Sequence, residues 1–318
     1  MKIRFGFVSN ATCLWEASPA KTVTFKRYST LGQEEGMRKL LDVTKQNLEN
    51  TLRVLQYNTA HQVELYRLSS SIVPLATHPD VNWDFVTPFK KEWKQLGDWV
   101  LANNMRVSFH PNQFTLFTSP KTTITQNAVK DMEFHYKMLQ AMGIAEQSFI
   151  NIHIGGAYGD KDSAIIRFHD NLRSLPEQVK ARMTLENDDK TYTAAETLRV
   201  CKTESIPFVF DYHHHLANLS EEPLNELLTD VFTTWEQANA VPKIHISSPK
   251  SASEFRSHAD YIDIAFIMPL LKALTDLGKD VDFMIEAKMK DQAMLKLIED
   301  ISRIRGVKRV SGGSVFIK

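Results

Sequence analysis

Six consecutive apolar runs in this chain end on a histidine or a carboxylate, and this pattern restricts the folds that the chain can adopt. The residues at the ends of the runs are His110, His153, Glu186, Asp211, His245 and Glu286. Each interval between them is long enough for one helix and one strand. Short apolar runs that alternate with helical segments predict a parallel sheet covered by helices.

Eight strands and eight helices are predicted from the apolar periodicity. The predicted strands are 3–8, 63–68, 106–109, 148–152, 182–185, 207–210, 243–247 and 282–285. The predicted helices are 34–57, 89–103, 126–142, 162–179, 194–203, 223–238, 258–277 and 291–304. The segment 9–32 is predicted to be a long loop.

This alternation predicts a (β/α)8 TIM barrel of the α/β class, whose active sites lie at the C-terminal ends of the strands. The alternative is an open doubly wound sheet, which would not bring six consecutive strand ends around one point. We expect one domain over 1–318, with the barrel over 1–306 and a C-terminal tail over 307–318.

Composition favours an intracellular protein without a membrane segment. The 38 Lys and Arg residues balance the 38 Asp and Glu residues, so any surface that binds a polyanion must be local. Cys13 and Cys201 are too few for a disulfide framework. We expect a cytoplasmic protein, and no feature of the sequence indicates an obligate protein partner or a signal peptide.

Histidine and carboxylate side chains around one point are suited to divalent cations. Such a ring can hold more than one ion, and clusters of two or three ions activate water in phosphoryl displacement. Glu186 is near the middle of the series and could bridge two ions. The ligand types fit Mn²⁺ or Zn²⁺ and do not choose between them.

Three histidines follow Asp211, and alternation alone does not decide which of them is a ligand. In a continuous strand His213 would lie on the same side as Asp211. His214 would be on that side only if the strand ended near Asp211. The sequence leaves both residues as candidates.

Short motifs along the whole chain resemble the UV damage endonuclease family, whose members share the barrel and metal layout of endonuclease IV. The motifs are 4–10 (RFGFVSN), 66–70 (YRLSS), 108–113 (SFHPNQ), 151–156 (NIHIGG), 185–188 (LEND), 211–214 (DYHH), 243–245 (KIH) and 284–288 (MIEAK). The resemblance implies single-strand incision of damaged double-stranded DNA immediately 5′ to a UV photoproduct, which leaves a 3′-hydroxyl. Cyclobutane pyrimidine dimers and 6-4 photoproducts are the implied lesions, and abasic sites are a further candidate.

The resemblance also implies three divalent ions, usually Mn²⁺, and assigns their ligands. The implied first site is His110, His153 and Glu186, the second is Glu186, Asp211, His258 and Glu286, and the third is His214, His245 and a modified Lys243. The family spacing therefore selects His214 over His213. Glu186 and Lys243 are the implied catalytic residues.

Lys243 precedes His245 by two residues, so both side chains are expected on the metal face of the strand. An ammonium group beside several cations is unfavourable, and both burial and positive neighbours lower a lysine pKa. A neutral amine can add CO₂ to form a carbamate, which is an anionic oxygen ligand. The alternative is an ammonium group that extends into solvent at the strand end.

Contacts with DNA are predicted on the loops that follow the strands. Gln113 and Phe114 come directly after His110, where side chains could fill the gap left by displaced bases. The family often has tyrosine in place of Phe114. The alternative is that Phe114 packs within the loop and does not contact DNA. The other predicted contacts are Asn10, Arg67, Ser69, Lys250, Arg256 and Lys288. Each cation taken singly could also be a solvated surface charge.

Two other functions fit parts of this pattern. A metal-dependent sugar isomerase or epimerase would use similar ligands, but it would need only one or two ions and a small closed pocket. A non-catalytic DNA-binding barrel would have no use for a complete ligand set, because buried charges are costly without metals. Exposed cations and aromatic residues on the loops favour a polymeric substrate.

Overall fold

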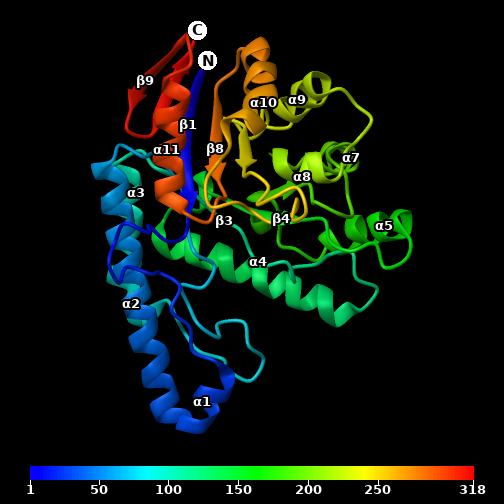
Figure 1. Ribbon diagram of the computed structural model, residues 1–318. Coiled ribbons are helices and arrows are strands. Elements are labelled where there is room, and N and C mark those ends of the chain that lie inside the picture. The colour runs from blue at the N-terminus through cyan, green and yellow to red at the C-terminus, as the bar shows by residue number, and fades with distance from the viewer.

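The computed structural model describes residues 1–318 and contains a closed barrel of eight parallel strands (Figure 1). The strands are β1 (Lys2–Val8), β2 (Leu65–Arg67), β3 (Arg106–Phe109), β4 (Phe149–His153), β5 (Met183–Glu186), β6 (Phe208–Asp211), β7 (Lys243–Ile246) and β8 (Val281–Ile285). Pairing of β1 with both β8 and β2 closes the sheet. The predicted TIM barrel is confirmed.

Helices cover the outside of the barrel. They are α1 (Phe25–Leu31), α2 (Gln33–Ala60), α3 (Lys90–Ala102), α4 (Thr122–Met142), α5 (Lys161–Leu172), α6 (Glu177–Lys180), α7 (Ala194–Glu204), α8 (Tyr212–Ala217), α9 (Leu224–Thr233), α10 (Ile264–Leu277) and α11 (Lys290–Ser302), with short 3-10 helices at Thr87–Phe89 and Ala145–Gln147. Every residue of β5, β6, β7 and β8 is buried, as expected for parallel strands covered on both faces. No helix combines the length and the apolar composition needed to cross a bilayer.

Three predicted helices were wrong in their bounds. The segment predicted at 162–179 is divided into α5 and α6, because Pro176 disfavours helical backbone at the preceding residue. The segment predicted at 223–238 ends at Thr233, and the turn that follows brings Thr234 and Trp235 into hydrogen bonds with the backbone of Phe208.

The third helix with wrong bounds was predicted to begin at His258, which is also a predicted metal ligand. The helix predicted at 258–277 begins only at Ile264, where the side chain of Asp263 caps it by accepting from the backbone of Ala265. His258 therefore lies on a loop, where its backbone bridges to Pro249. The predicted loop at 9–32 contains α1, which Thr24 caps.

The C-terminal residues form a hairpin of β9 (Val307–Ser311) and β10 (Ser314–Ile317). β10 pairs antiparallel with the first residues of β1, so the hairpin extends the sheet at the N-terminal end of the barrel. Both chain termini lie at this end (Figure 1).

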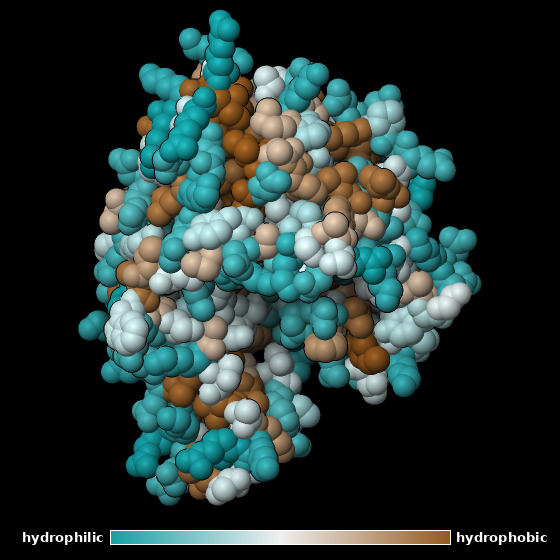
Figure 2. All heavy atoms as spheres, in the orientation of Figure 1, coloured by the Kyte–Doolittle hydropathy of each residue, from teal (hydrophilic) through white to brown (hydrophobic).

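The opposite end of the barrel is bordered by a projection made of α1 and the adjacent part of α2, at the bottom of Figure 1. These two helices pack against each other. The space-filling view shows the surface hollowed between this projection and the body of the barrel (Figure 2). The C-terminal ends of the strands point toward this side of the molecule.

Candidate metal centre

Four histidines surround the carboxylate of Glu186 at the C-terminal mouth of the barrel. Glu186 is the last residue of β5 and is fully buried. The distances from its oxygens are 3.1 Å to His110 Nε2, 4.0 Å to His153 Nε2, 3.4 Å to His214 Nδ1 and 3.0 Å to His245 Nδ1. One carboxylate thus lies close to side chains from β4, from β7, from the residue directly after β3 and from the start of α8.

Three overlapping groups of side chains have the proximity that metal ligands require. They are His110, His153 and Glu186; Glu186, Asp211 and His214; and Glu186, His245 and Glu286, each with its ligand atoms within 4.8 Å of one another. Four buried atoms of these groups, His153 Nδ1, Glu186 Oε1, Asp211 Oδ2 and His245 Nδ1, make no contact with hydrogen-bond geometry, although His245 Nδ1 is 3.0 Å from a carboxylate oxygen of both Glu186 and Glu286. Buried polar atoms without partners are rare, so this donor set fits divalent cations.

The charges within the centre depend on one another. Burial by itself would raise the pKa of Glu186, but the positive charges of His245 and His153 hold it well below the usual range. Burial likewise opposes protonation of His245, yet Glu186 and Glu286 raise its pKa to about 9. Without metal, positively charged imidazoles and negatively charged carboxylates thus stabilise each other's charge. Bound cations would take the place of the positive imidazolium charges.

The end of β6 decides which of the three histidines faces the centre. Asp211 ends the strand and caps α8, with its side chain accepting from the backbone N–H of His214 at 2.7 Å. The helical turn therefore brings His214 to the Glu186 carboxylate. His213 contacts Ser247 Oγ and the carbonyl of Phe255 through its two ring nitrogens. This geometry favours His214 as the ligand.

His258 lies beside the second group without belonging to it. Its ring centroid is 6.2 Å from that of His214. Its Nδ1 donates to the carbonyl of Glu286 at 2.7 Å, an arrangement that fixes the ring and leaves Nε2 free of hydrogen bonds. The carboxylate of Glu286 forms an ion pair with Arg67, which is half-buried at the mouth of the barrel.

Lys243 lies deeper in the barrel than the three groups. The residue is 3% exposed, and its Nζ donates to Ser108 Oγ at 2.9 Å. Burial, together with the nearby charge of Arg106, holds the pKa of Lys243 well below its usual range. The alternative of an ammonium group extended into solvent is wrong, because Nζ is buried inside the barrel at Ser108.

Two buried amides, Asn151 and Asn187, hold candidate ligands in place, and neither was predicted to be a site residue. Asn151 Nδ2 donates to Glu186 Oε2 at 2.5 Å and is itself fixed by Thr184. Asn187 exchanges hydrogen bonds with the backbone N–H and carbonyl of Asp211. Asn151 could have been found from the sequence, because it precedes His153 by two residues in the same strand.

Gln113 and Phe114 are both exposed on the loop that follows β3, in accordance with their predicted position. Phe114 is 71% exposed, so it does not pack within its own loop. Its ring borders a cavity of about 230 Å³ with an otherwise polar lining that includes Asn112, Asn127 and Lys130. An exposed aromatic ring beside a polar cavity is suited to contact with a base.

The other predicted DNA contacts occupy different environments. Lys250, Arg256 and Lys288 are exposed, whereas Asn10 is partly buried and Ser69 is buried within a turn, where its Oγ accepts from the backbone of Ser71. Lys290 differs from the exposed Lys288 in its surroundings. It is half-buried near Arg67 and Glu286, and burial together with the charge of Arg67 lowers its pKa.

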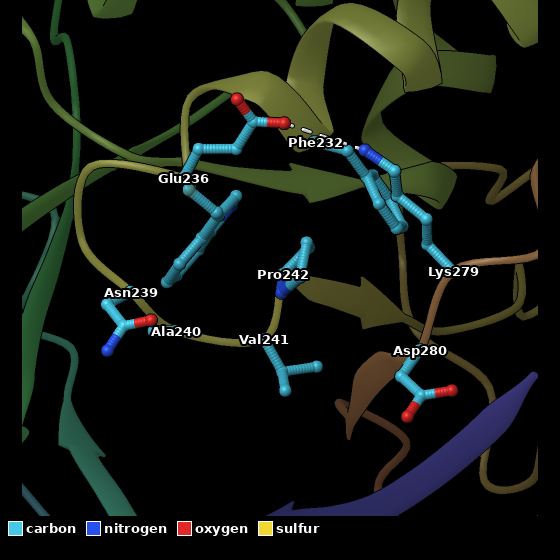
Figure 3. Close-up of a pocket in the computed structure, with 9 residues that line it drawn as sticks. Phe232, Glu236, Asn239, Ala240, Val241, Pro242, Lys279 and Asp280 are labelled. Carbon is cyan, nitrogen blue, oxygen red and sulfur yellow. Dashed lines mark ion pairs between the residues drawn. The ribbon is translucent and has the colours of Figure 1, made fainter.

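Two further cavities lie at the other, N-terminal end of the barrel. One of about 460 Å³ is lined by Phe232, Trp235 and Pro242 and includes the Glu236–Lys279 ion pair (Figure 3). No histidine lines it. In TIM barrels this end contributes to stability, and reactions take place at the C-terminal mouth.

The fold and the site together define a TIM barrel with candidate metal ligands at its C-terminal mouth. The family model described as UV-endonuclease UvdE matches residues 3–318, and the chain belongs to this family. The UV DNA damage endonuclease of Bacillus pumilus (strain SAFR-032) is 61% identical over 316 residues, which cover 99% of both chains. The protein of the same name from Bacillus thuringiensis subsp. konkukian (strain 97-27) is 59% identical over 99% of both. The predicted resemblance is confirmed.

Solved structures agree with this assignment. The crystal structure of SacUVDE matches 95% of this chain and 100% of its own, with a TM-score of 0.84 and 26% identity. A 3-keto-D-glucoside 4-epimerase from E. coli also matches, with a TM-score of 0.55 and 13% identity over 90% of this chain. The likeness to the epimerase shows the shared barrel fold alone.

Proposed function

We propose that this protein is a DNA repair endonuclease that nicks one strand of UV-damaged DNA immediately 5′ to the photoproduct, leaving a 3′-hydroxyl. The observation that carries the proposal is the convergence of three candidate ligand groups on Glu186 at the barrel mouth. Membership of the UvdE family supports DNA as the substrate, and the relatives named above are UV DNA damage endonucleases.

The proposed cofactors are three divalent ions, with Mn²⁺ favoured and Zn²⁺ as the alternative. His110, His153 and Glu186 would hold the first, Glu186, Asp211 and His214 the second, and Glu186, His245 and Glu286 the third. The family resemblance adds His258 to the second set, and its ring centroid is 6.2 Å from that of His214. When bound, such ions supply an activated water and stabilise charge on the attacking and leaving oxygens.

The protein itself would position the DNA strand. Arg67 and Lys290 lie beside Glu286 at the mouth of the barrel, where their positive charges suit a phosphodiester group. Exposed Lys250, Arg256 and Lys288 would contact phosphates farther from the reaction. The hollow beside the α1–α2 projection gives a duplex access to this side of the molecule (Figure 2).

A nicking assay tests the proposed function. Supercoiled plasmid, either irradiated with UV light or left untreated, is incubated with the protein and Mn²⁺. We expect relaxation of the irradiated plasmid alone, and addition of EDTA should abolish it. Equal nicking of both plasmids, or activity that persists in EDTA, would contradict the proposal.

Gln113 and Phe114 are expected to probe the lesion. Replacement of both by alanine should weaken binding to irradiated DNA by about tenfold or more, because stacking of a base on an aromatic ring contributes about 1–3 kcal/mol. Binding to intact DNA should change little. Fluorescence anisotropy with matched irradiated and intact duplexes measures both affinities.

Leu101→Ala is a matched control for this experiment. Leu101 is also an exposed apolar residue, but it lines a cavity at the other end of the barrel. Its replacement should leave both affinities unchanged. An equal loss of affinity for both duplexes in the Gln113 and Phe114 variant would contradict a role in lesion recognition.

We further propose that Lys243 is carboxylated and contributes an oxygen ligand to the metal centre. Lys243 is buried and precedes His245 by two residues on the same strand. Nearby Arg106 and Arg67 disfavour an ammonium group and would balance the charge of a carbamate.

Electron density from metal-bound crystals grown near neutral pH is the appropriate measurement for Lys243. We expect density for a carboxyl group beyond Nζ, with one oxygen at about 2.0–2.2 Å from an ion. Density that ends at Nζ in fully metal-loaded crystals would disprove the modification. Intact mass in acid is unsuitable, because carbamates decompose there.

A further inference from the structure

Tyr158 combines exposure with an unfavourable backbone conformation on the loop between β4 and α5. Its side chain is 46% exposed, and its φ is +51°. Left-handed backbone is uncommon for any residue other than glycine and is an outlier for a bulky side chain. Tyr158 is the only aromatic residue with positive φ in this protein. Such outliers are concentrated at functional sites.

The surrounding loop holds the ring in one position. Gly155 and Gly159, with φ of +120° and +88°, allow the tight path of the loop around Tyr158. A Cβ atom at Gly156 would lie 3.5 Å from the ring, an ordinary van der Waals distance, so Gly156 is directly beside the ring. Arg167, from α5, places its guanidinium group 6.0 Å from the ring centroid.

The loop of Tyr158 and the following helix α5 contact the loop that carries Gln113 and Phe114. Arg167 Nε donates to the carbonyl of Thr118 at 2.8 Å, and Asn171 Nδ2 donates to the carbonyl of Phe117 at 2.7 Å. A Cβ atom at Gly155 would lie only 2.6 Å from Thr118 Oγ1. The two loops are therefore in direct contact, and each follows a strand whose end provides a histidine of the candidate metal centre.

We propose that the ring of Tyr158 is a second aromatic DNA contact, which stacks on an unstacked nucleotide of the damaged strand alongside Phe114. This inference rests on the proposed endonuclease function. An exposed ring whose backbone conformation is fixed, and which lies beside the guanidinium group of Arg167, loses less conformational freedom when it meets a substrate. The sequence signal is the glycine-rich stretch 155–159, which follows His153 directly.

Three substitutions separate contact with DNA from a structural role. Tyr158→Gly and Tyr158→Ala should each weaken binding to an irradiated duplex by about 5- to 100-fold, the range expected for loss of one stacked base. Tyr158→Phe keeps the ring and should bind like the wild type. Glycine adopts positive φ without steric penalty, so Tyr158→Gly should melt at a higher temperature than Tyr158→Ala although both bind equally weakly.

Ile166→Ala is the matched control, because Ile166 is an exposed apolar residue on α5 with no role in this proposal. Affinity is measured by fluorescence anisotropy in EDTA, melting by calorimetry, and nicking of irradiated plasmid in Mn²⁺. Wild-type affinity in Tyr158→Gly, or a loss as large in Tyr158→Phe, would overturn the stacking role. If the wild-type protein nicks irradiated plasmid but the variants give either of these two contradicting results, only the assignment of Tyr158 fails. Absence of nicking by the wild type would overturn the proposed function, and this inference with it.

Discussion

Incision of irradiated DNA is expected to fall by at least about 1,000-fold when Glu186 is replaced by glutamine. Glu186 is the one residue shared by all three candidate ligand groups, so its carboxylate would be the bridging ligand of the cluster. Glutamine preserves the shape but removes the negative charge, and it offers only one good oxygen ligand. Metal stabilisation contributes several kcal/mol to such reactions, which corresponds to a rate effect of this size.

Single-turnover nicking of irradiated plasmid at saturating Mn²⁺ measures the loss, and anisotropy should show that DNA binding survives. Glu236→Gln is a matched control, because Glu236 is at the other end of the barrel, where it pairs with Lys279 (Figure 3). That variant should nick at the wild-type rate. Near-native incision by Glu186→Gln would refute the bridging role.

The positions of the candidate metal ligands could be predicted from the sequence because the barrel brings its strand ends together. Parallel strands that alternate with helices must bring their C-terminal ends to one mouth, so strand ends at His110, His153 and Glu186 had to meet. The same argument applies to His245 and Glu286. Strand bounds within a residue or two were sufficient, because each of these residues lies within one position of the end of its strand.

The sharing of ligands among ions could not be predicted in the same way. Strand alternation favoured His213, and only the capping of α8 by Asp211 brings His214 to Glu186. The groups that the structure forms also differ from those implied by the resemblance, since His214 joins Asp211 and His245 joins Glu286. These pairings depend on side-chain geometry at a helix start, which residue spacing does not specify.

Loops were the least predictable part of the site. The loop before α10 is longer than its sequence suggested, and it places His258 by a hydrogen bond to the backbone of Glu286. Tyr158 is notable only once its backbone conformation and the contacts of Arg167 are known. Propensity and periodicity describe helices and strands, whereas loop conformation depends on tertiary contacts.

Asp282 forms ion pairs with two arginines at the opposite, N-terminal end of the barrel. It lies on β8 with no exposed surface and accepts from Arg4 Nε at 2.7 Å and Arg4 Nη2 at 2.8 Å. Arg106 Nη1 donates to the same carboxylate at 2.5 Å and also to the carbonyl of Val241. One buried carboxylate therefore compensates two guanidinium groups that come from different strands.

Asp282→Asn is expected to lower the free energy of unfolding by about 3–5 kcal/mol, because it leaves buried positive charge without its partner. This is a large fraction of the 5–15 kcal/mol that is typical for folded proteins. Arg106→Met should cost less, because Asp282 keeps both hydrogen bonds from Arg4. Asp276→Asn, at an exposed position on α10, should stay within about 0.5 kcal/mol of the wild type. Guanidinium denaturation measures all three variants, and a loss below about 1 kcal/mol for Asp282→Asn would show that the arginines find other partners or solvent.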